Sequence, residues 1–411
     1  MRSFASATGV GLFETPPVAT SALQSQRASV NSGQFSLDSG ITSWDLSFMA
    51  DTLAGPFHRT GVILNVRFSC RIKAERDIGF EFMQTPFNIP STLRLILLAL
   101  FIGQSASVPA QSTPVEQHGQ LRVQGNRVVD KSGSFVALRG MSFFWSQWGG
   151  QYCNSNVVKW LRDDWHCTVV RVAMGVESGG YLTNPEREKE KVKTVVQAAI
   201  DLGIYVIIDW HDHNADKHLA QAQVFFEEMA RLYGKYPNVI YELWNEPLKQ
   251  HDWSTIIKPY HEAVIPKIRS LDLDNLIICG TQTWSQDVDK ASRDPLKFDN
   301  IAYTLHFYAA THKESLRTKA RTALANGVAL MVTEWGTSES SGNGRLDEEE
   351  TRNWWALMDE NQLSWCNWSL IDKNETSAAL IPKASATGGW STNDISRSGL
   401  LVREELRAKN P

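Results

Sequence analysis

The chain has no excess of basic residues and few cysteines, and both shortages exclude classes of function. Its 411 residues carry 41 Lys and Arg against 45 Asp and Glu, for a formal net charge of -4. Binding to nucleic acid phosphates requires a basic patch, so we expect no nucleic-acid partner. The five cysteines are scattered, without the short C-x-x-C spacing of a zinc or redox site. Cys153 and Cys167 flank a predicted helix about 15 Å long, which exceeds the roughly 7 Å reach of a disulfide, so we expect free, buried thiols.

The sequence also lacks an apolar run that could span a bilayer. Leu93–Ile102 is the candidate, but a transmembrane helix needs about 20 apolar residues. Its basic residue, short apolar core and following small residues are typical of a secretory signal peptide. Met83 stands at a suitable distance upstream. We therefore expect residues 1–82 to be a disordered upstream extension, 83–110 a signal peptide and 111–411 the folded domain of a secreted, extracellular protein. The alternatives are a buried segment in a long leader, or a membrane tether.

From Gly119 onward the pattern becomes regular and predicts an α/β fold. Gln120–Val123 and Arg127–Val129 flank Gln124-Gly-Asn126, which predicts a short β-hairpin. Amphipathic helical segments then alternate with near-continuous apolar runs, as expected of parallel strands that are buried on both faces. The predicted strands are Phe135–Met141, Thr168–Met174, Tyr205–His211, Val239–Trp244, Leu276–Gly280, Ile301–Phe307, Leu330–Trp335 and Ser364–Trp368. Eight such units predict a (β/α)8 TIM barrel with a short N-terminal β-hairpin, in which the fifth crossover is mostly irregular.

Two glutamates stand where such a barrel places its working groups. Glu246 follows the fourth predicted strand and Glu334 ends the seventh. Functional side chains of these barrels lie at the carboxyl ends of the strands, and strands four and seven nearly face each other across the mouth. Two facing carboxylates are what hydrolysis of a glycosidic bond requires. The structural alternative is that each glutamate forms a salt bridge with a neighbouring loop.

Several polar and aromatic residues at other strand ends could support this pair. Arg171, inside the second strand, must be paired, either with Glu334 in the site or with Glu242 in a structural role. Asn245 can donate to a sugar 2-hydroxyl, or can simply help a turn. The triplet His211-Asp212-His213 lacks the spacing of a helical metal-binding pair, so we expect no metal. The further candidates are His306, Tyr308 and Trp368 at strand ends, with Trp145, Trp148, Trp284 and Trp335 in or near the loops.

These motifs together resemble glycoside hydrolase family 5. The resemblance rests on Asn245-Glu-Pro247, Thr333-Glu-Trp-Gly336, His306-Phe-Tyr308 and Asp209-Trp-His211, and it extends from about Gly119 to Lys409. It is close to the β-1,4-endoglucanases (cellulases) found in bacteria and plant-parasitic nematodes. The resemblance implies a retaining double displacement, with Glu334 as nucleophile and Glu246 as general acid and then base. It also implies a raised pKa for Glu246, caused by the neighbouring Glu334.

The resemblance further implies a substrate site without a cofactor. We expect support from Arg171, His211, Asn245, His306, Tyr308, Trp368, Lys373, Glu375, Trp284, Trp148 and Tyr181. The chain departs from bacterial relatives at Phe144, where they carry histidine, and at Gly175, where they carry an aromatic residue. We expect a monomer acting on β-1,4-glucan. Activity on mannan, xyloglucan or mixed-linkage glucan, and a non-catalytic sugar-binding barrel, remain alternatives.

Overall fold

The computed structural model describes residues 43–51, 63–71 and 112–410. Two long strands, β1 (Ser43–Asp51) and β2 (Ile63–Arg71), form an antiparallel pair in which Ser43 lies opposite Arg71. This pair belongs to the segment that we expect to be an upstream extension, and the extension stays a prediction. The predicted signal peptide at 83–110 lies outside the described residues.

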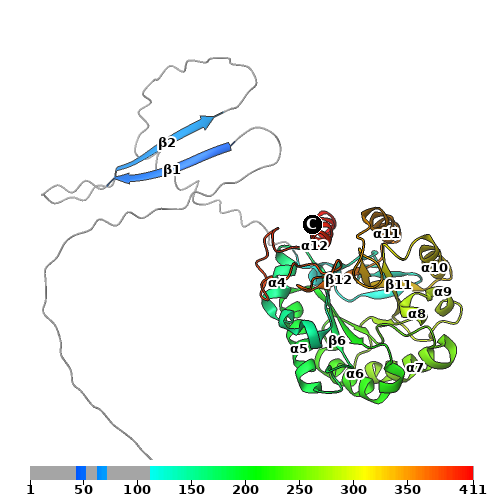
Figure 1. Cartoon of the computed structure of the whole chain (residues 1–411). Helices are drawn as coiled ribbons and strands as arrows, with labels where there is room; N and C mark the ends of the chain where they lie inside the picture. The colour runs from blue at the N-terminus through cyan, green and yellow to red at the C-terminus, as the bar shows by residue number, and fades with distance from the viewer. Residues whose placement is uncertain (1–42, 52–62, 72–111, 411) are drawn as a thin grey trace, which may run out of the picture. The chain divides into compact units, whose positions relative to one another are not determined.

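The second unit is a closed barrel of eight parallel strands, which confirms the predicted fold (Figure 1). Each strand pairs with the next along the chain, and the last pairs with the first, with Trp365 beside Arg139. The strands are β5 (Arg139–Phe143), β6 (Val169–Gly175), β7 (Tyr205–His211), β8 (Val239–Glu242), β9 (Ile277–Cys279), β10 (Ile301–Tyr308), β11 (Ala329–Gly336) and β12 (Trp365–Leu370). A closed barrel brings the carboxyl ends of all eight strands to one rim.

The predicted hairpin is present, whereas the first barrel strand begins later than predicted, at Arg139 instead of Phe135. Strands β3 (Arg122–Gln124) and β4 (Arg127–Val129) pair antiparallel, and Gly125 has the positive φ of +60° that their tight turn requires. Phe135, predicted to begin the first barrel strand, forms an isolated bridge with Val129 instead. The hairpin side chain of Val128 packs with Leu121 and with the barrel residue Ile207. The hairpin therefore closes the amino-terminal end of the barrel core.

Helices surround the barrel (Figure 1), and five of them, which begin at residues 114, 155, 185, 348 and 397, start at a side-chain cap. Asn184 caps the helix that begins at Pro185, and Gly203 ends it in the left-handed conformation. The helices are α2 (Pro114–His118), α3 (Ser146–Gly149), α4 (Ser155–Asp163), α5 (Pro185–Leu202), α6 (Leu219–Tyr233), α7 (Lys258–Arg269), α8 (Gln282–Ser285), α9 (Val288–Ala291), α10 (Glu314–Ala325), α11 (Glu348–Glu360) and α12 (Arg397–Lys409), with short turns of helix η1 (Gly150–Tyr152), η2 (Ala215–His218) and η3 (Trp253–Ile257). The fifth crossover holds only α8 and α9, which confirms that it is largely irregular.

Side chains alternate along β7 between the helix-facing layer and the barrel interior, whereas register shifts interrupt this alternation in β11 and β12. On β7, Val206, Ile208 and Trp210 pack in the outer core, while Tyr205 and Ile207 fill the base of the interior. The next interior positions on this strand are Asp209 and His211, both buried. The barrel interior thus changes from apolar at its base to ionisable at the rim, so that the barrel places polar groups where the strands end.

No helix in the described ranges is both long and apolar enough to traverse a lipid bilayer. The four cysteines of residues 112–410 are free and buried, as expected: Cys153, Cys167, Cys279 and Cys366.

Candidate active site

The two predicted carboxylates meet at the carboxyl-terminal rim of the barrel. One carboxylate oxygen of Glu246, one of Glu334 and one ring nitrogen of His306 all lie within 4.8 Å of one another. Glu334 stands in β11, and Glu246 follows β8, where its backbone N–H donates to the carbonyl oxygen of Asp212 over 3.3 Å. A separation of about 5–5.5 Å is typical of retaining glycosidases, whereas inverting enzymes need roughly 6.5–9.5 Å.

Arg171 in β6 is the charged centre beneath this pair and is fully buried. Its Nη1 donates to Glu334 Oε2 over 3.1 Å, and its Nε donates to Glu242 Oε2 over 2.7 Å. Its Nη2 lies 2.9 Å from Asp209 Oδ2 and donates to Asn245 Oδ1 over 2.6 Å. The two partners that the sequence left as alternatives, Glu334 and Glu242, are therefore both bound. The planar guanidinium group can satisfy several partners at once because it has five N–H donors.

Two residues of β10 bind the two carboxylates from the same strand face. His306 Nδ1 lies 3.1 Å from Glu246 Oε1, and the Tyr308 hydroxyl donates to Glu334 Oε1 over 2.9 Å. His306 Nε2 lies 2.9 Å from Thr333 Oγ1, which in turn donates to Glu242 over 2.7 Å. This chain of hydrogen bonds fixes the orientation of the imidazole ring.

An aromatic wall stands beside the carboxylates. The Trp368 indole stacks on the His211 ring, with centroids 5.2 Å apart and planes at 6°. His211 Nδ1 lies 2.6 Å from Asp209 Oδ2, and Trp145 packs edge-on against the same imidazole at 4.0 Å. Burial, with Arg171 nearby, holds the pKa of His211 well below its usual value. A neutral, orientated imidazole can donate a hydrogen bond without adding charge.

The pKa values of Glu246 and Glu334 differ from what the sequence predicts. Burial opposes the ionisation of Glu246, but hydrogen bonds to His213 and His306 outweigh it and bring the pKa to about 2. Burial raises the pKa of Glu334, and the neighbouring Glu246 charge adds to this effect. The expectation of a raised pKa for Glu246 is therefore wrong for the free protein, because it considered Glu334 and neglected the two imidazoles. For His306, burial is outweighed by bonds to Glu242 and Glu246, which raise its pKa to about 9.

These groups open into a cleft of about 630 Å³. Eleven of the predicted site residues line it, namely Glu246, Glu334, His211, His306, Tyr308, Trp368, Lys373, Glu375, Trp284, Trp148 and Trp145. Arg171 and Asn245 lie buried beneath it. The Lys373 ammonium forms an ion pair with Glu375 and lies 5.3 Å from the centroid of the Phe144 ring. The cleft thus combines flat aromatic faces with convergent polar groups, the composition that suits a sugar chain.

Tyr181 and Trp335 are the two candidate residues that the structure places elsewhere, and the Trp335 ring is fully buried in the outer core, 5.4 Å from Trp365. The chain turns back after β6, and the Tyr181 backbone N–H donates to the Gly175 carbonyl oxygen over 2.8 Å. The Tyr181 ring packs in the core, 5.0 Å from Trp210 and 5.8 Å from Phe225, and only 7% of the residue is exposed. Tyr181 is a core residue, so its assignment to the substrate site is wrong.

Several cleft residues were missed by sequence reasoning. His213 and His312 line the cleft, as do Thr283, Gln286 and Ser340–Gly342. His213 was visible only as part of a triplet that we considered for metal binding. His213 lies in the loop directly after β7, a strand that ends in the site, and this position in the sequence could have identified it. Gln286 and Ser340–Gly342 lie in loops whose path the sequence does not reveal.

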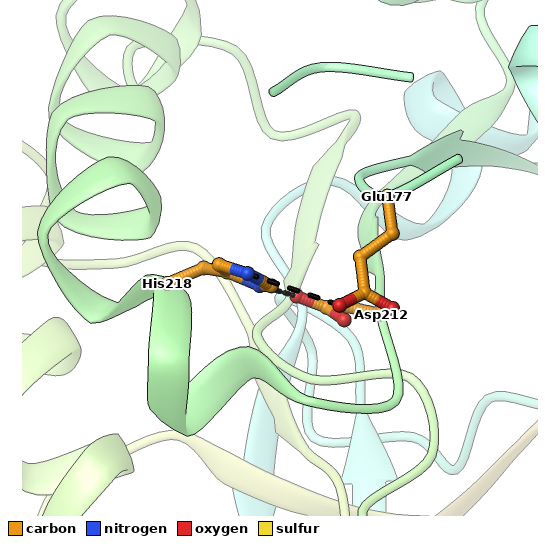
Figure 2. A group of neighbouring side chains, drawn as sticks. All are labelled: Glu177, Asp212 and His218. Carbon is orange, nitrogen blue, oxygen red and sulfur yellow. Dashed lines mark hydrogen bonds and ion pairs between the residues drawn. The ribbon is translucent and has the colours of Figure 1, made fainter. Parts of the chain in front are cut away.

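A second cluster of ionisable side chains stands next to the cleft (Figure 2). Glu177, Asp212 and His218 offer ligand atoms within 4.8 Å of one another. His218 Nδ1 lies 2.7 Å from Asp212 Oδ2, and its Nε2 lies 3.9 Å from Glu177 Oε1. The imidazole therefore links two carboxylates from separate loops. The hydrogen bond between His218 and Asp212 accounts for this arrangement, and the expectation of no metal stays a prediction.

Comparison with known proteins agrees with this geometry. The family model described as Cellulase (glycosyl hydrolase family 5) matches residues 129–374. The chain is 46% identical over 321 residues to an endoglucanase of Clostridium saccharobutylicum, covering 77% of this chain and 72% of that protein. It is 49% identical over 325 residues to endoglucanase N of Pectobacterium atrosepticum, covering 78% and 73%.

Solved structures give the same result. A structure from Cytophaga hutchinsonii is 57% identical with a TM-score of 0.72, covering 73% of this chain and 98% of that one. The catalytic domain of Thermobifida fusca endoglucanase Cel5A, solved as a variant in complex with cellotetraose, is 33% identical with a TM-score of 0.70, covering 72% and 100%. The chain therefore belongs to glycosyl hydrolase family 5, among its endoglucanases.

Proposed function

We propose that the enzyme cleaves internal β-1,4-glucosidic bonds of cellulose and related β-glucans with retention of configuration. The observation that carries this proposal is the separation of the two carboxylates, whose oxygens approach within 4.8 Å. That gap suits direct attack by one carboxylate and leaves too little room for the water of an inverting mechanism. The cleft and its aromatic wall support a glucan chain as the substrate, and a relative was solved with cellotetraose.

In the first step Glu334 is the nucleophile and Glu246 the acid. A Glu334 oxygen bonds to the anomeric carbon while the glycosidic C–O bond breaks, and Glu246 gives its proton to the departing oxygen. Arg171 and Tyr308 hold Glu334 by hydrogen bonds of 3.1 and 2.9 Å, which orientate the attacking oxygen and oppose the rise in the pKa of Glu334 that burial causes. Asn245, held by Arg171, presents its amide to the sugar 2-hydroxyl, where hydrogen bonds strengthen in the transition state.

The first step requires the protonated form of Glu246. In the free enzyme the balance favours an ionised Glu246 beside a protonated His306, whose Nδ1 lies 3.1 Å from Oε1. Glu246 therefore acts as the acid through its less populated, protonated form, and the carboxylate that remains becomes the base of the second step. In the second step Glu246 removes a proton from water, the water oxygen bonds to the anomeric carbon, and the bond to Glu334 breaks.

The test replaces each carboxylate by its isosteric amide in the full chain. Glu246→Gln removes the acid, and we expect a fall of about 10²–10⁴-fold in hydrolysis of carboxymethylcellulose. Glu334→Gln removes the nucleophile, and we expect activity to fall to background. NMR of the first-formed product should show the β-anomer. Full activity of either variant, or an initial α-anomer, would refute the assignment.

Substrate range is tested separately by reducing-sugar release from carboxymethylcellulose, mannan, xyloglucan and mixed-linkage glucan. We expect carboxymethylcellulose to exceed mannan, and the reverse order would favour the family's other activities. We also propose secretion after removal of 83–110 and a monomeric enzyme. Sequencing the amino terminus of the protein from culture medium and measuring its mass in solution test these two proposals.

A further inference from the structure

The loop after β7 brings a second histidine onto Glu246. His213 Nε2 lies 3.2 Å from Glu246 Oε2, while His306 Nδ1 lies 3.1 Å from Oε1. Each carboxylate oxygen of Glu246 therefore has its own imidazole partner. The His213 side chain is 35% exposed and lines the cleft, so that this hydrogen bond stands at the wall where substrate binds.

The loop that carries His213 is held from several elements. The buried Asp212 carboxylate accepts from the Asn214 backbone N–H over 2.8 Å and lies 2.7 Å from His218 Nδ1. Glu177, from the loop after β6, also approaches His218, with 3.9 Å between its Oε1 and Nε2 of the imidazole (Figure 2). The Asp212 carbonyl oxygen also accepts the backbone N–H of Glu246. The Glu177–His218–Asp212 cluster thus fixes the loop on both sides of the His213–Glu246 hydrogen bond.

The surroundings of His213 favour its charged form. The carboxylates that face it are Glu246 from the loop after β8, Glu334 from β11 and Asp212 from its own loop. The neighbouring ring of His211 is held neutral, and Trp145 packs against the His213 ring at 5.5 Å and 72°. Burial disfavours the charge, but hydrogen bonding and attraction to Glu246 outweigh it and raise the pKa of His213.

We propose that His213 is a positioning residue for Glu246, which fixes the direction of the carboxyl group and sets the pH range in which that group can act as the acid. This inference rests on the proposed role of Glu246. His306 alone holds only one of the two carboxylate oxygens. Without His213 the group could rotate about its Cγ–Cδ bond and would bind its proton more tightly.

The experiment compares two substrates that differ in their need for an acid. Cellotetraose has a poor leaving group that must be protonated, whereas 2,4-dinitrophenyl β-cellobioside has a leaving group that departs without a proton. For His213→Ala we expect kcat/KM on cellotetraose to fall about tenfold, which is a part of the usual contribution of a general acid. On the dinitrophenyl substrate we expect kcat/KM to stay within about twofold, since the acid is not needed there.

The pH profile and two further variants sharpen the test. Loss of the positive partner should move the alkaline limb of kcat/KM on cellotetraose to higher pH. His213→Asn, whose amide can still donate, should recover part of the rate but keep the shifted limb. Glu177→Gln, which weakens the anchoring cluster, should show the same substrate-selective loss at about two- to threefold. His118→Asn, which alters a histidine 3.5 Å from Asp130 near the amino-terminal hairpin, is the matched control and should change nothing.

An equal loss on both substrates would show a merely structural role and overturn the inference, as would an unchanged rate and pH profile. Glu246→Gln is measured in parallel. If it abolishes cellotetraose cleavage while His213→Ala does not affect it, this inference fails and the proposed function stands. If Glu246→Gln retains full activity, the proposed function itself fails.

Discussion

Arg171 and Glu334 form a buried ion pair with 3.1 Å between Nη1 and Oε2, although the same guanidinium also binds Glu242 and Asp209. Three carboxylates therefore surround one permanent positive charge. The Arg171 guanidinium thus holds the nucleophile candidate and also supports the barrel interior. We therefore expect Arg171 to contribute to both stability and catalysis.

Substitution of Arg171 should consequently affect both properties. A lysine in its place keeps the charge but cannot present the planar set of donors. We expect Arg171→Lys to lower the free energy of unfolding by about 3 kcal/mol, because buried carboxylates lose their partners. Denaturant unfolding measures this change. The control Arg139→Lys, at a partly exposed pair with Asp359, should cost less than about 1 kcal/mol. Equal effects of the two substitutions would contradict the central role of Arg171.

Tyr308 offers a more selective test of the nucleophile. Tyr308→Phe removes the hydroxyl that donates to Glu334 Oε1, and this hydrogen bond favours the ionised carboxylate. We expect kcat to fall about tenfold and the acid limb of the pH profile to move to higher pH, since the pKa of Glu334 should rise further. Steady-state kinetics on cellotetraose measure both. Tyr303→Phe, on the same strand but bonded to the Leu296 backbone, should leave the profile unmoved.

The pH dependence of stability should reflect His306. Its pKa is raised from 6.5 to about 9, so its contribution is fully present below pH 6.5 and is lost as the pH rises to about 9. For Glu246, lowered from 4.5 to about 2, the contribution is present above pH 4.5 and is lost as the pH falls toward 2. Urea unfolding at pH 5.5, 7.5 and 9 should show stability falling with pH in this range. The fall should be smaller in His306→Asn, and an identical slope would contradict the assignment.

Two glycines near the strands should respond very differently to an added methyl group. A Cβ at Gly140 would overlap the Val169 backbone carbonyl oxygen of the neighbouring strand, whereas a Cβ at Gly175 would meet the flexible end of the Gln147 side chain. We expect Gly140→Ala to cost about 3 kcal/mol and Gly175→Ala less than about 1 kcal/mol. Thermal and denaturant unfolding compare them. Comparable losses would mean that Gln147 cannot move aside.

The sequence predicts side-chain directions well along a regular strand, where alternate residues face opposite sides of the sheet. Along β7 the interior positions can be read directly as Tyr205, Ile207, Asp209 and His211, and the structure places all four inside the barrel. The same alternation places Arg171 inside the barrel, because the backbone geometry of a strand decides which way each side chain points. It does not place Glu334, since Ala329 and Met331 face the interior and a register shift in β11 then turns Glu334 inward.

The sequence predicts side-chain positions less well where the path of a loop determines them. Tyr181 was expected in the site from the resemblance, but the tight turn at Gly179–Gly180 directs its ring into the core. His213 was overlooked because its approach to Glu246 depends on the paths of two loops, which the sequence does not reveal. The misjudged pKa of Glu246 has the same origin. A carboxyl group responds to every charge around it, and the sequence revealed only one of them.

The four buried thiols of the barrel unit have a practical consequence. Since Cys153, Cys167, Cys279 and Cys366 are all unpaired, no covalent cross-link among them stabilises residues 112–410. The unit should therefore mature equally well in a reducing cytosol and in an oxidising medium. Added dithiothreitol should leave its melting temperature unchanged, which makes a bacterial cytoplasm a suitable place to produce it.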